Sequence, residues 1–309
     1  MKLKKAVATE KMKILSKCEY SLPSSVVIGK FDGVHKGHQE LISIAKEISK
    51  KENLTLLAFT FDSSGECITD SDEKAHLLKA LGVDLFYSQN FSEDFKSTSP
   101  EDFIDLLKTK LNAKHIVVGF NFKFGRKRCG DTALMEKLCL EKGIKITVCK
   151  PVMFNGEPIS STRIRASLKD GDMESAKNML GRNFSVRSKV ISGKMLGRQM
   201  GFPTANMEIS HFSLIPKHGV YASFVNLADT TYPAITNLGK NPTVDSDGAI
   251  KAETHIIGFN GDLYGKELSI GFLKRLRDEA DFKNIENLKS QLLSDKKCAT
   301  EIFKTIVDK

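Results

Sequence analysis

The segment Ser25-Val-Val-Ile-Gly-Lys-Phe-Asp-Gly-Val-His-Lys-Gly-His38 carries the pattern that decides the fold of the first half of the chain. Its apolar start predicts a buried strand, and apolar residues at helical spacing follow between residues 39 and 50. A glycine-rich turn joins the two. In an open α/β sheet, ligands bind where a strand ends and a helix begins, because the first N–H groups of the helix have no partner there. The segment therefore predicts an anion site.

The glycines and histidines of this turn suit a phosphate. Gly29, Gly33 and Gly37 allow the backbone to come close to a ligand, and His35 and His38 can donate hydrogen bonds to its oxygens. Taken without the rest of the chain, two histidines beside a turn fit a structural or a metal-binding role at least as well.

Short apolar runs alternate with helical patterns up to residue 183. We expect strands at residues 25–28, 54–59, 84–86, 116–118 and 144–148, and helices at residues 39–50, 73–81, from 99 onward and 132–142. Strands separated by helices predict a parallel sheet with crossover connections.

The pattern changes after residue 183. Short β-branched or alternating runs, separated by Gly, Pro and Asn, occupy residues 186–192, 220–227, 234–238, 252–259 and 267–272. They predict an antiparallel sandwich or barrel, and helical spacing returns only over residues 284–307. We expect two domains, residues 1–183 and residues 184–309.

Composition agrees with a globular chain of two domains. The chain has 309 residues, of which 40% are hydrophobic and 28% charged, and a domain holds roughly 100–200 residues. No run approaches the roughly 18 apolar residues of a membrane helix, and the six cysteines are scattered without zinc-ligand spacing. We expect a cytoplasmic protein with reduced thiols that does not enter a membrane.

The charge balance favours an anionic ligand. Lys and Arg number 47 against 38 Asp and Glu, a formal net charge of +9. The largest local excess is formed by Lys123, Arg126, Lys127 and Arg128. This cluster fits a phosphate site, a nucleic-acid surface or a solvated loop, and charge alone does not separate the three.

Three motifs in the first half resemble one family. Gly33-Val-His-Lys-Gly-His38 is similar to the HxGH signature of nucleotidyltransferases, and the longer Phe31–Gln39 string resembles the bacterial bifunctional riboflavin kinase/FMN adenylyltransferases, or FAD synthetases. The segments Gly119-Phe-Asn-Phe-Lys-Phe-Gly125 and Ile159-Ser-Ser-Thr-Arg-Ile-Arg165 agree in content and order. The resemblance implies a Rossmann-like α/β nucleotidyltransferase domain with a parallel sheet.

The resemblance also implies residue roles. His35 and His38 would be catalytic and would balance charge on a triphosphate. Contacts to nucleotide and phosphate would come from Gly29, Phe31, Asp32, Gly33, Gly37, Ser160, Ser161, Thr162, Arg163 and Arg165. Contacts to the flavin would come from Asn121, Phe122 and Phe124, although the alternating phenylalanines also fit a plain core. The Ser-Ser-Thr hydroxyls suit a helix cap whose free N–H groups hold phosphate.

The first half of the sequence departs from the family at two places. Relatives usually carry two prolines, often with a histidine, after the second strand, whereas this chain reads Phe59-Thr-Phe-Asp-Ser-Ser-Gly65. Lys30 stands where Asn is usual. Both changes leave the phosphate-binding residues in place and put contacts to the nucleotide base or the flavin in question.

A second set of motifs resembles riboflavin kinase. Gly193-Lys-Met-Leu-Gly-Arg-Gln-Met-Gly-Phe-Pro-Thr-Ala-Asn206 is similar to the long signature of that family, and matching strings follow in order at residues 219–222, 237–243, 253–256, 262–265 and 275–282. The resemblance implies an antiparallel β-barrel kinase domain with C-terminal helices. Gly193, Lys194, Gly197, Arg198, Gly201 and Pro203 would bind the nucleotide, Thr204 and Asn206 a Mg²⁺ ion, and Arg277 and Phe282 the flavin. Glu253 is the implied base that deprotonates the ribityl hydroxyl.

Together the motifs predict riboflavin phosphorylation to FMN in the second domain and FMN adenylylation to FAD in the first. The expected partners are ATP, riboflavin and FMN, with Mg²⁺ accompanying ATP, and FMN and FAD are substrate and product and not prosthetic groups. No nucleic acid and no obligate protein partner is expected. Two alternatives remain: a riboflavin kinase whose nucleotidyltransferase domain is weakened or changed in specificity, and, more distantly, a nucleic-acid-binding protein that uses the +9 charge.

Overall fold

The computed structural model describes residues 12–62, 65–192, 197, 201–209, 214–227, 230–240, 250–282 and 284–307. The chain divides into two compact units. One comprises Met1–Gly65 and Thr69–Ile159, and the other comprises Glu66–Ile68 and Ser160–Lys309. Every helix within the described ranges is too short or too polar to span a lipid bilayer.

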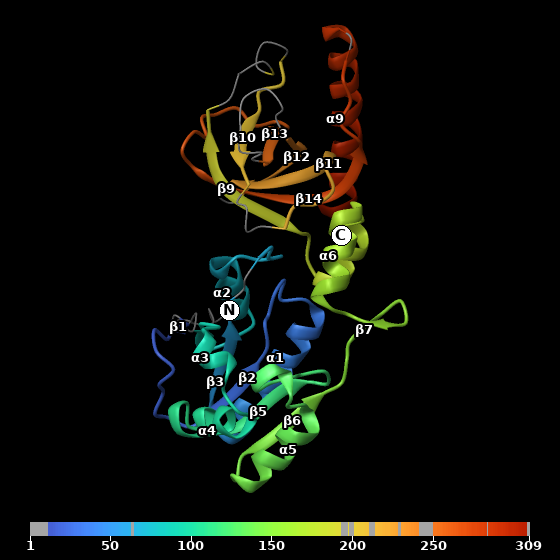
Figure 1. Cartoon of the computed structure of the whole chain (residues 1–309). Coiled ribbons are helices and arrows are strands. Elements are labelled where there is room, and N and C mark those ends of the chain that lie inside the picture. The colour runs from blue at the N-terminus through green and yellow to red at the C-terminus, as the bar shows by residue number, and fades with distance from the viewer. Residues whose placement is uncertain are drawn as a thin grey trace, which may run out of the picture. The chain divides into compact units, whose positions relative to one another are not determined.

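The first unit contains a six-stranded parallel sheet (Figure 1). Its order is β1-β4-β3-β2-β5-β6, with bounds Lys13–Ile14 (β1), Ser24–Ile28 (β2), Thr55–Phe61 (β3), Leu85–Gln89 (β4), Ala113–Gly119 (β5) and Lys145–Cys149 (β6). This confirms the predicted parallel sheet, and β1 is an edge strand that the sequence patterns did not predict. From β2 the chain runs outward through β3 and β4 and then returns to β5 on the other side, so the carboxyl end of β2 lies at the point where the strand order reverses.

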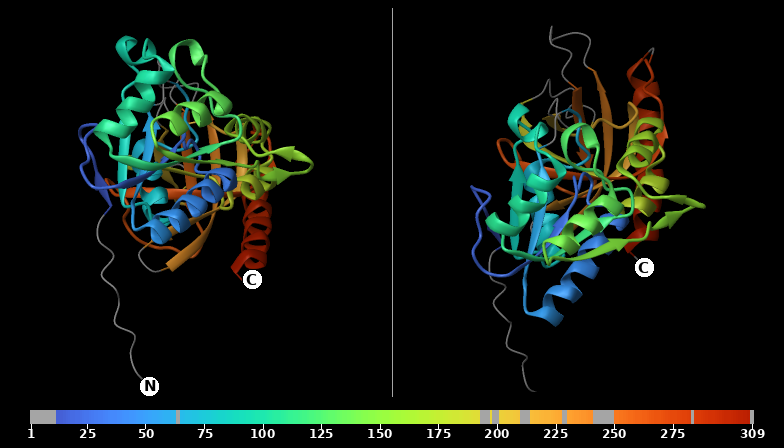
Figure 2. Two further views of the ribbon diagram at one scale, coloured as in Figure 1. Left: turned by 90° about the horizontal axis from the view of Figure 1, so that it is seen from below. Right: turned by 60° about the horizontal axis from the view of Figure 1, so that its bottom comes forward.

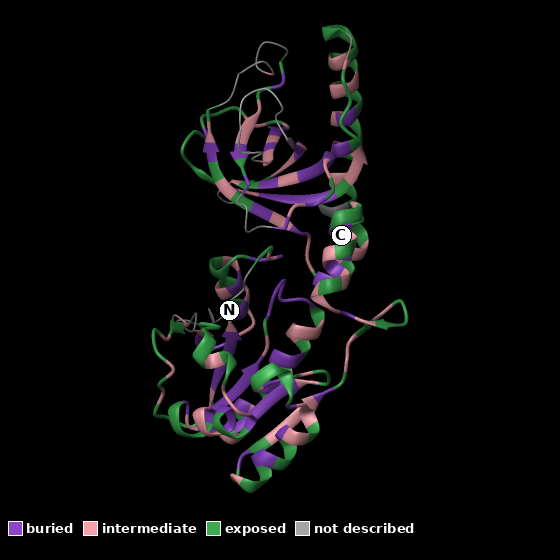
Figure 3. Ribbon diagram, in the orientation of Figure 1, coloured by how far each residue is buried: buried purple, intermediate pink, exposed green. Residues whose placement is uncertain are grey.

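Helices cover both faces of this sheet. They are α1 (Lys36–Glu52), α2 (Ser71–Ala80), α3 (Glu93–Lys96), α4 (Pro100–Lys110) and α5 (Thr132–Glu141), with a 3-10 turn η1 at Arg126–Arg128 and a small hairpin of β7 (Met153–Phe154) and β8 (Glu157–Pro158). Because strand side chains alternate, Val26 and Ile28 pack toward α4 and α5, whereas Val27 packs toward α1 and α2. Buried positions concentrate in the central strands, which form the middle layer (Figure 3).

The second unit is built on a closed antiparallel barrel in the order β10-β13-β12-β11-β14-β9. The strands are β9 (Ser185–Ile191), β10 (Ala205–Glu208), β11 (Gly219–Leu227), β12 (Thr230–Lys240), β13 (Ile250–Ile256) and β14 (Glu267–Arg277). The barrel confirms the predicted fold class. Strand β10 was not predicted because it is only four residues long and follows Pro203, so its sequence reads as a turn.

Helices complete the second unit. The last helix, α9 (Ile285–Val307), lies along the outside of the barrel (Figure 2). Its Ala299 packs with Val220, Ala222 and Ile235. Helices α6 (Ser161–Asp170) and α7 (Met173–Leu180) also belong to this unit, and the Lys217 N–H donates to the Leu168 carbonyl at 3.0 Å. The predicted boundary between residues 183 and 184 therefore refers to a change of fold, while the compact units divide after residue 159.

Candidate active sites

The loop between β2 and α1 forms the first site. His35 is the N-cap residue of α1, and its Nδ1 accepts a hydrogen bond from the His38 N–H at 3.3 Å. The two imidazole rings stack with their centroids 3.6 Å apart. Since Nδ1 accepts, the uncharged His35 ring carries its proton on Nε2, which can donate to an anion. The loop thus combines a neutral N–H donor with the N-terminus of a 17-residue helix.

Glycine and positive φ angles shape this loop. A Cβ on Gly37 would lie 3.1 Å from the His35 ring, so the missing side chain leaves room for the imidazole. Phe31, Gly33 and Val34 all have positive φ values of 49°, 80° and 39°. A phenylalanine and a valine held in the left-handed region are strained, and such strain is common at functional sites.

Both histidines are uncharged at neutral pH. Burial lowers the pKa of His35 to about 4. The pKa of His38 is also lowered, first by burial, then by the neighbouring His35 and by the positive charge of Lys74, which is itself only 4% exposed. Within the described part of the chain, His38 Nδ1 is buried without a hydrogen-bond partner. The two rings therefore act as neutral hydrogen-bonding groups beside a buried lysine.

A segment remote in sequence holds the loop in place. The Gly33 N–H donates to Thr69 Oγ1 at 3.1 Å, and the Thr69 N–H donates to Asp32 Oδ1 at 3.4 Å. Asp32 and Thr69 are both buried. Neither Thr69 nor Lys74 lies in a recognised motif, so sequence patterns do not indicate them, and the fold brings them to the loop.

Aromatic side chains gather where β3, β4 and β5 end. Phe61 packs against Phe91 and Phe95 with ring centroids 5.8 Å and 6.1 Å away, and Phe91 is 49% exposed. Of the predicted flavin contacts after β5, Asn121 is exposed, Phe122 is half-buried and stacks on Phe124, and Phe124 is buried in the core. Phe124 thus packs in the core and contacts the Phe122 ring, which lies closer to solvent.

The Ser160–Arg165 segment forms a capped helix start. Ser160 is the N-cap of α6 and its Oγ accepts from the Arg163 N–H at 3.3 Å. Ser161 begins the helix, Thr162 is exposed, and Arg163 and Arg165 are half-buried. This arrangement matches the predicted cap, and it belongs to the second unit by its contacts. Of the basic cluster, Lys123 pairs with Asp131 at 3.5 Å, and Arg126, Lys127 and Arg128 are exposed.

A row of polar residues crosses the barrel at the predicted kinase site. In the strand register, Asn206 on β10 and Asn237 on β12 both lie directly opposite Glu253 on β13. Directly opposed residues share one face of a sheet, so the carboxylate is flanked by two amides. Asn237 Nδ2 also donates to Glu279 Oε1 at 3.0 Å, and its Oδ1 is buried without a partner among the described residues.

The segment that leads into β10 is closely packed. The Phe202 N–H donates to the Gly197 carbonyl at 2.8 Å, and a Cβ on Gly197 would collide with the Phe202 carbonyl oxygen. Gly201 has a φ of 82°, which favours glycine. Pro203 is exposed, Thr204 and Asn206 are half-buried, and Asn206 Nδ2 donates weakly to the Thr204 carbonyl at 3.5 Å. The predicted contacts Gly193, Lys194 and Arg198 lie outside the described residues.

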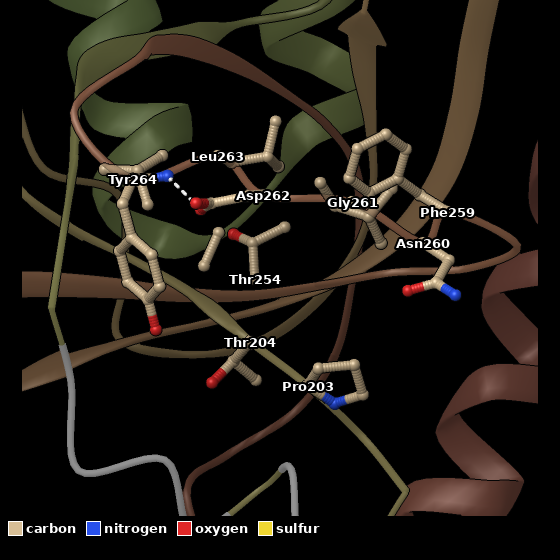
Figure 4. Close-up of a pocket in the computed structure, with 12 residues that line it drawn as sticks. Pro203, Thr204, Thr254, Phe259, Asn260, Gly261, Asp262, Leu263 and Tyr264 are labelled. Carbon is tan, nitrogen blue, oxygen red and sulfur yellow. Dashed lines mark hydrogen bonds between the residues drawn. The ribbon is translucent and has the colours of Figure 1, made fainter.

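A cavity of about 490 Å³ opens beside Thr204 (Figure 4). Pro203, Thr204 and Thr254 line one part of it, and the segment from Phe259 to Tyr264 lines another. The Tyr264 N–H donates to Asp262 Oδ1 at 2.9 Å, which ties that segment into a turn. Apolar walls with a few polar groups suit a planar heterocycle. The family resemblance gives residues 262–265 no role, and the fold places them on this cavity.

Arg277 is fixed at the end of β14. Its guanidinium bonds Asp295 of α9 through Nε at 3.1 Å and through Nη2 at 2.8 Å, and it lies over the Phe282 ring at 5.7 Å. Gln291 Nε2 donates to the same carboxylate at 2.9 Å. The two predicted flavin contacts are therefore adjacent, and α9 holds them through a buried aspartate.

The first unit is a parallel α/β sheet whose glycine-rich turn leads into α1, and the second is a closed barrel with a carboxylate between two amides. This combination is the one expected of a nucleotidyltransferase domain joined to a kinase domain. Residues 18–163 match the family model of FAD synthetase, and residues 180–303 match that of riboflavin kinase. Bifunctional riboflavin kinase/FMN adenylyltransferases of Listeria monocytogenes and Escherichia coli strain K12 are 32% and 34% identical. The alignments cover 92% and 90% of this chain and 93% and 92% of those proteins.

A crystal structure described as a macrolide-efflux protein from Streptococcus pneumoniae has a similar fold. It is 31% identical, has a TM-score of 0.86, and the match covers 94% of this chain and 99% of that one. From the two family models and the curated relatives, the chain belongs to the bifunctional riboflavin kinase/FMN adenylyltransferase family.

Proposed function

We propose that the barrel unit phosphorylates riboflavin with ATP, releasing ADP, and that the α/β unit adenylylates FMN with ATP, releasing pyrophosphate. As a member of the family, the chain is an enzyme of flavin cofactor biosynthesis, with riboflavin, FMN and ATP as substrates. FMN and FAD are then substrate and product. We keep residues 1–183 and 184–309 as the two functional modules.

The row of polar side chains around Glu253 carries the kinase assignment. Glu253 is half-buried between Asn206 and Asn237, where a carboxylate can accept the proton of an attacking hydroxyl. Phosphoryl transfer needs mainly positioning and charge stabilisation, so one base and a set of phosphate contacts suffice. Arg277 and Phe282 would hold the flavin, and the cavity beside Thr204 would hold the base of ATP.

Thr204 and Asn206 fit a Mg²⁺ ion. Both offer uncharged oxygens, and Mg²⁺ is usually held by one or two protein oxygens together with substrate phosphates. Asn206 uses its amide nitrogen toward the Thr204 carbonyl, which leaves its side-chain oxygen for other contacts. When bound there, Mg²⁺ would offset negative charge on the ATP phosphates.

The α1 start carries the adenylyltransferase assignment. His35 Nε2–H and the N–H groups at the start of α1 provide donors for a triphosphate, and the neighbouring buried Lys74 adds positive potential. Attack by the FMN phosphate on the α-phosphorus needs no protein nucleophile. Gly29, Phe31, Asp32, Gly33, Gly37 and the Ser160–Arg165 helix start remain the proposed phosphate and nucleotide contacts, with Asn121, Phe122 and Phe124 on the flavin side.

Glu253→Gln tests the assignment. Purified protein is incubated with riboflavin and Mg·ATP, and flavins are separated by chromatography. We expect Glu253→Gln to lower FMN formation by about a hundredfold or more, as for loss of a general base, while FAD still forms from supplied FMN. Glu267→Gln, which changes an exposed carboxylate on β14, is the matched control. Loss of both reactions in the folded Glu253→Gln protein would contradict the role, and no flavin product from wild type would refute the proposal.

A second candidate keeps the kinase and changes the nucleotide or flavin preference of the α/β unit. It is favoured by the residues at the end of β3, where Asp62 accepts a hydrogen bond from Ser88 and Phe61 packs against the exposed Phe91, in place of the family's prolines. FAD yield from FMN with ATP, set against the dinucleotide yield with CTP or GTP, separates the two. A preference for CTP or GTP would support the second candidate.

A further inference from the structure

His255 makes one hydrogen bond that reaches across the barrel wall to the segment before β10. It lies on β13 two residues after Glu253, so the two side chains leave the same face of the strand. Its Nδ1 is 3.0 Å from the carbonyl oxygen of Pro203. Because a carbonyl oxygen only accepts, Nδ1 must carry the proton and the ring donates.

The Pro203 carbonyl lies outside the ladder between β10 and β13. The ladder between β10 and β13 begins at the pair Ala205 and Thr254. Proline has no N–H and cannot extend such a ladder by donating to it. The imidazole of His255 bonds the Pro203 carbonyl two residues before the ladder starts.

Burial and aromatic packing hold the ring of His255 in this position. It is 8% exposed and packs edge-on against Phe202, with ring centroids 5.1 Å apart. Its Nε2 is buried without a hydrogen-bond partner among the described residues. Among the described residues, the ring is thus bonded through Nδ1 to Pro203, on a strand that also carries Glu253.

Pro203 is followed directly by a residue of the proposed kinase site. Thr204 lines the cavity and leads into Asn206, which lies opposite Glu253. On the other side, Gly197 accepts the Phe202 N–H. The backbone from Phe202 to Thr204 is consequently held at two points among the described residues, and the His255 bond joins it to the strand that carries the proposed base.

We propose that His255 is a positioning residue of the kinase site, whose Nδ1–H···O=C bond to Pro203 holds Thr204 and Asn206 in register with Glu253. This inference rests on the proposed kinase function of the barrel. It assigns His255 no contact with substrate, and its effect is exerted through the Pro203 carbonyl.

Three variants separate the hydrogen bond from packing. His255→Phe keeps a ring against Phe202 and removes the donor. His255→Asn puts an amide nitrogen where Nδ1 stood, and His255→Gln puts one nearer the position of Nε2. We expect His255→Phe and His255→Gln to lower kcat/KM for riboflavin about tenfold, the loss typical of one hydrogen bond, and His255→Asn to recover most of it.

Two further measurements do not depend on turnover. Binding of Mg·ADP, measured by calorimetry, is expected to weaken several-fold in His255→Phe and to stay near wild type in His255→Asn. Amide hydrogen exchange over residues 204–208 is expected to accelerate in His255→Phe. FAD formation from supplied FMN, which belongs to the other unit, is expected to be unchanged and controls for general damage.

The outcomes are distinct. Wild-type kinetics, Mg·ADP affinity and exchange in His255→Phe would overturn the inference. Equal losses in His255→Asn and His255→Gln would also overturn it, because the loss would then follow packing and not the bond. A wild-type protein that forms no FMN would refute the proposed function instead, and the exchange comparison would still decide whether the bond holds the segment.

Discussion

Removing the negative charge of Asp295 should loosen α9 from the barrel and weaken the proposed riboflavin site. Asp295 is buried, whereas the Arg277 side chain is 22% exposed, and two N–H···O bonds and the Gln291 amide converge on the carboxylate. Asp295→Asn keeps the shape and leaves the guanidinium without its counter-charge.

The expected loss of α9 docking stability in Asp295→Asn lies between two limits. Breaking a fully buried ion pair costs about 3–5 kcal/mol, and an exposed pair contributes about 0–1 kcal/mol. With one buried and one partly exposed partner, we expect Asp295→Asn to lower the stability of α9 docking by about 2 kcal/mol, which is roughly a thirtyfold change in the opening equilibrium. Because Arg277 also lies over Phe282, the KM for riboflavin should rise several-fold more than kcat falls.

A double-mutant cycle checks this number. Opening free energies of α9 are measured by native-state hydrogen exchange in the full chain for wild type, Asp295→Asn, Arg277→Met and the double variant. The coupling between the two substitutions is expected to be about 2 kcal/mol. A coupling below about 0.5 kcal/mol, together with an unchanged KM for riboflavin, would refute the reasoning, because the pair would then behave as an ordinary surface contact.

Three other outcomes are expected in the α/β unit. Gly37→Ala should displace the His35 ring and slow FAD formation from FMN about tenfold without affecting FMN formation; equal rates would contradict the close packing. Thr69→Val removes the acceptor of the Gly33 N–H and should cost about 1 kcal/mol of stability, whereas Thr69→Ser should restore it; urea denaturation measures both. Burial lowers the pKa of His35 from 6.5 to about 4, so the unfolded chain takes up a proton first as pH falls through that window. The contribution of the neutral His35 ring to the free energy of unfolding is therefore fully present above pH 6.5 and falls by about 3 kcal/mol toward pH 4. If the plot of unfolding free energy against pH is as steep in His35→Gln as in wild type, this reasoning is contradicted.

Local patterns predicted much of the fold. Ser99 and Pro100 begin α4 as their sequence indicates, and the Ser99 hydroxyl accepts from the Asp102 N–H at 3.0 Å. Ser160 caps α6 in the same way. Caps and periodicity act between residues three or four positions apart, so they can be read from a short window. The short strand β10 escaped prediction because four residues after a proline carry too little pattern.

The sequence by itself determined the two fold classes, the order of the motifs and the family, since each depends on residue types at short, regular spacing. Only the tertiary structure decided that Thr69 holds Gly33, that Asn237 lies opposite Glu253 and that Asp295 holds Arg277. These pairs are 36, 16 and 18 residues apart in the chain, and their meeting depends on strand register and on the docking of α9. Register is set by the packing of a whole sheet, because a slip of one residue turns every side chain to the other face. The motifs therefore identified the chemistry, and the barrel and sheet decided which side chains surround it.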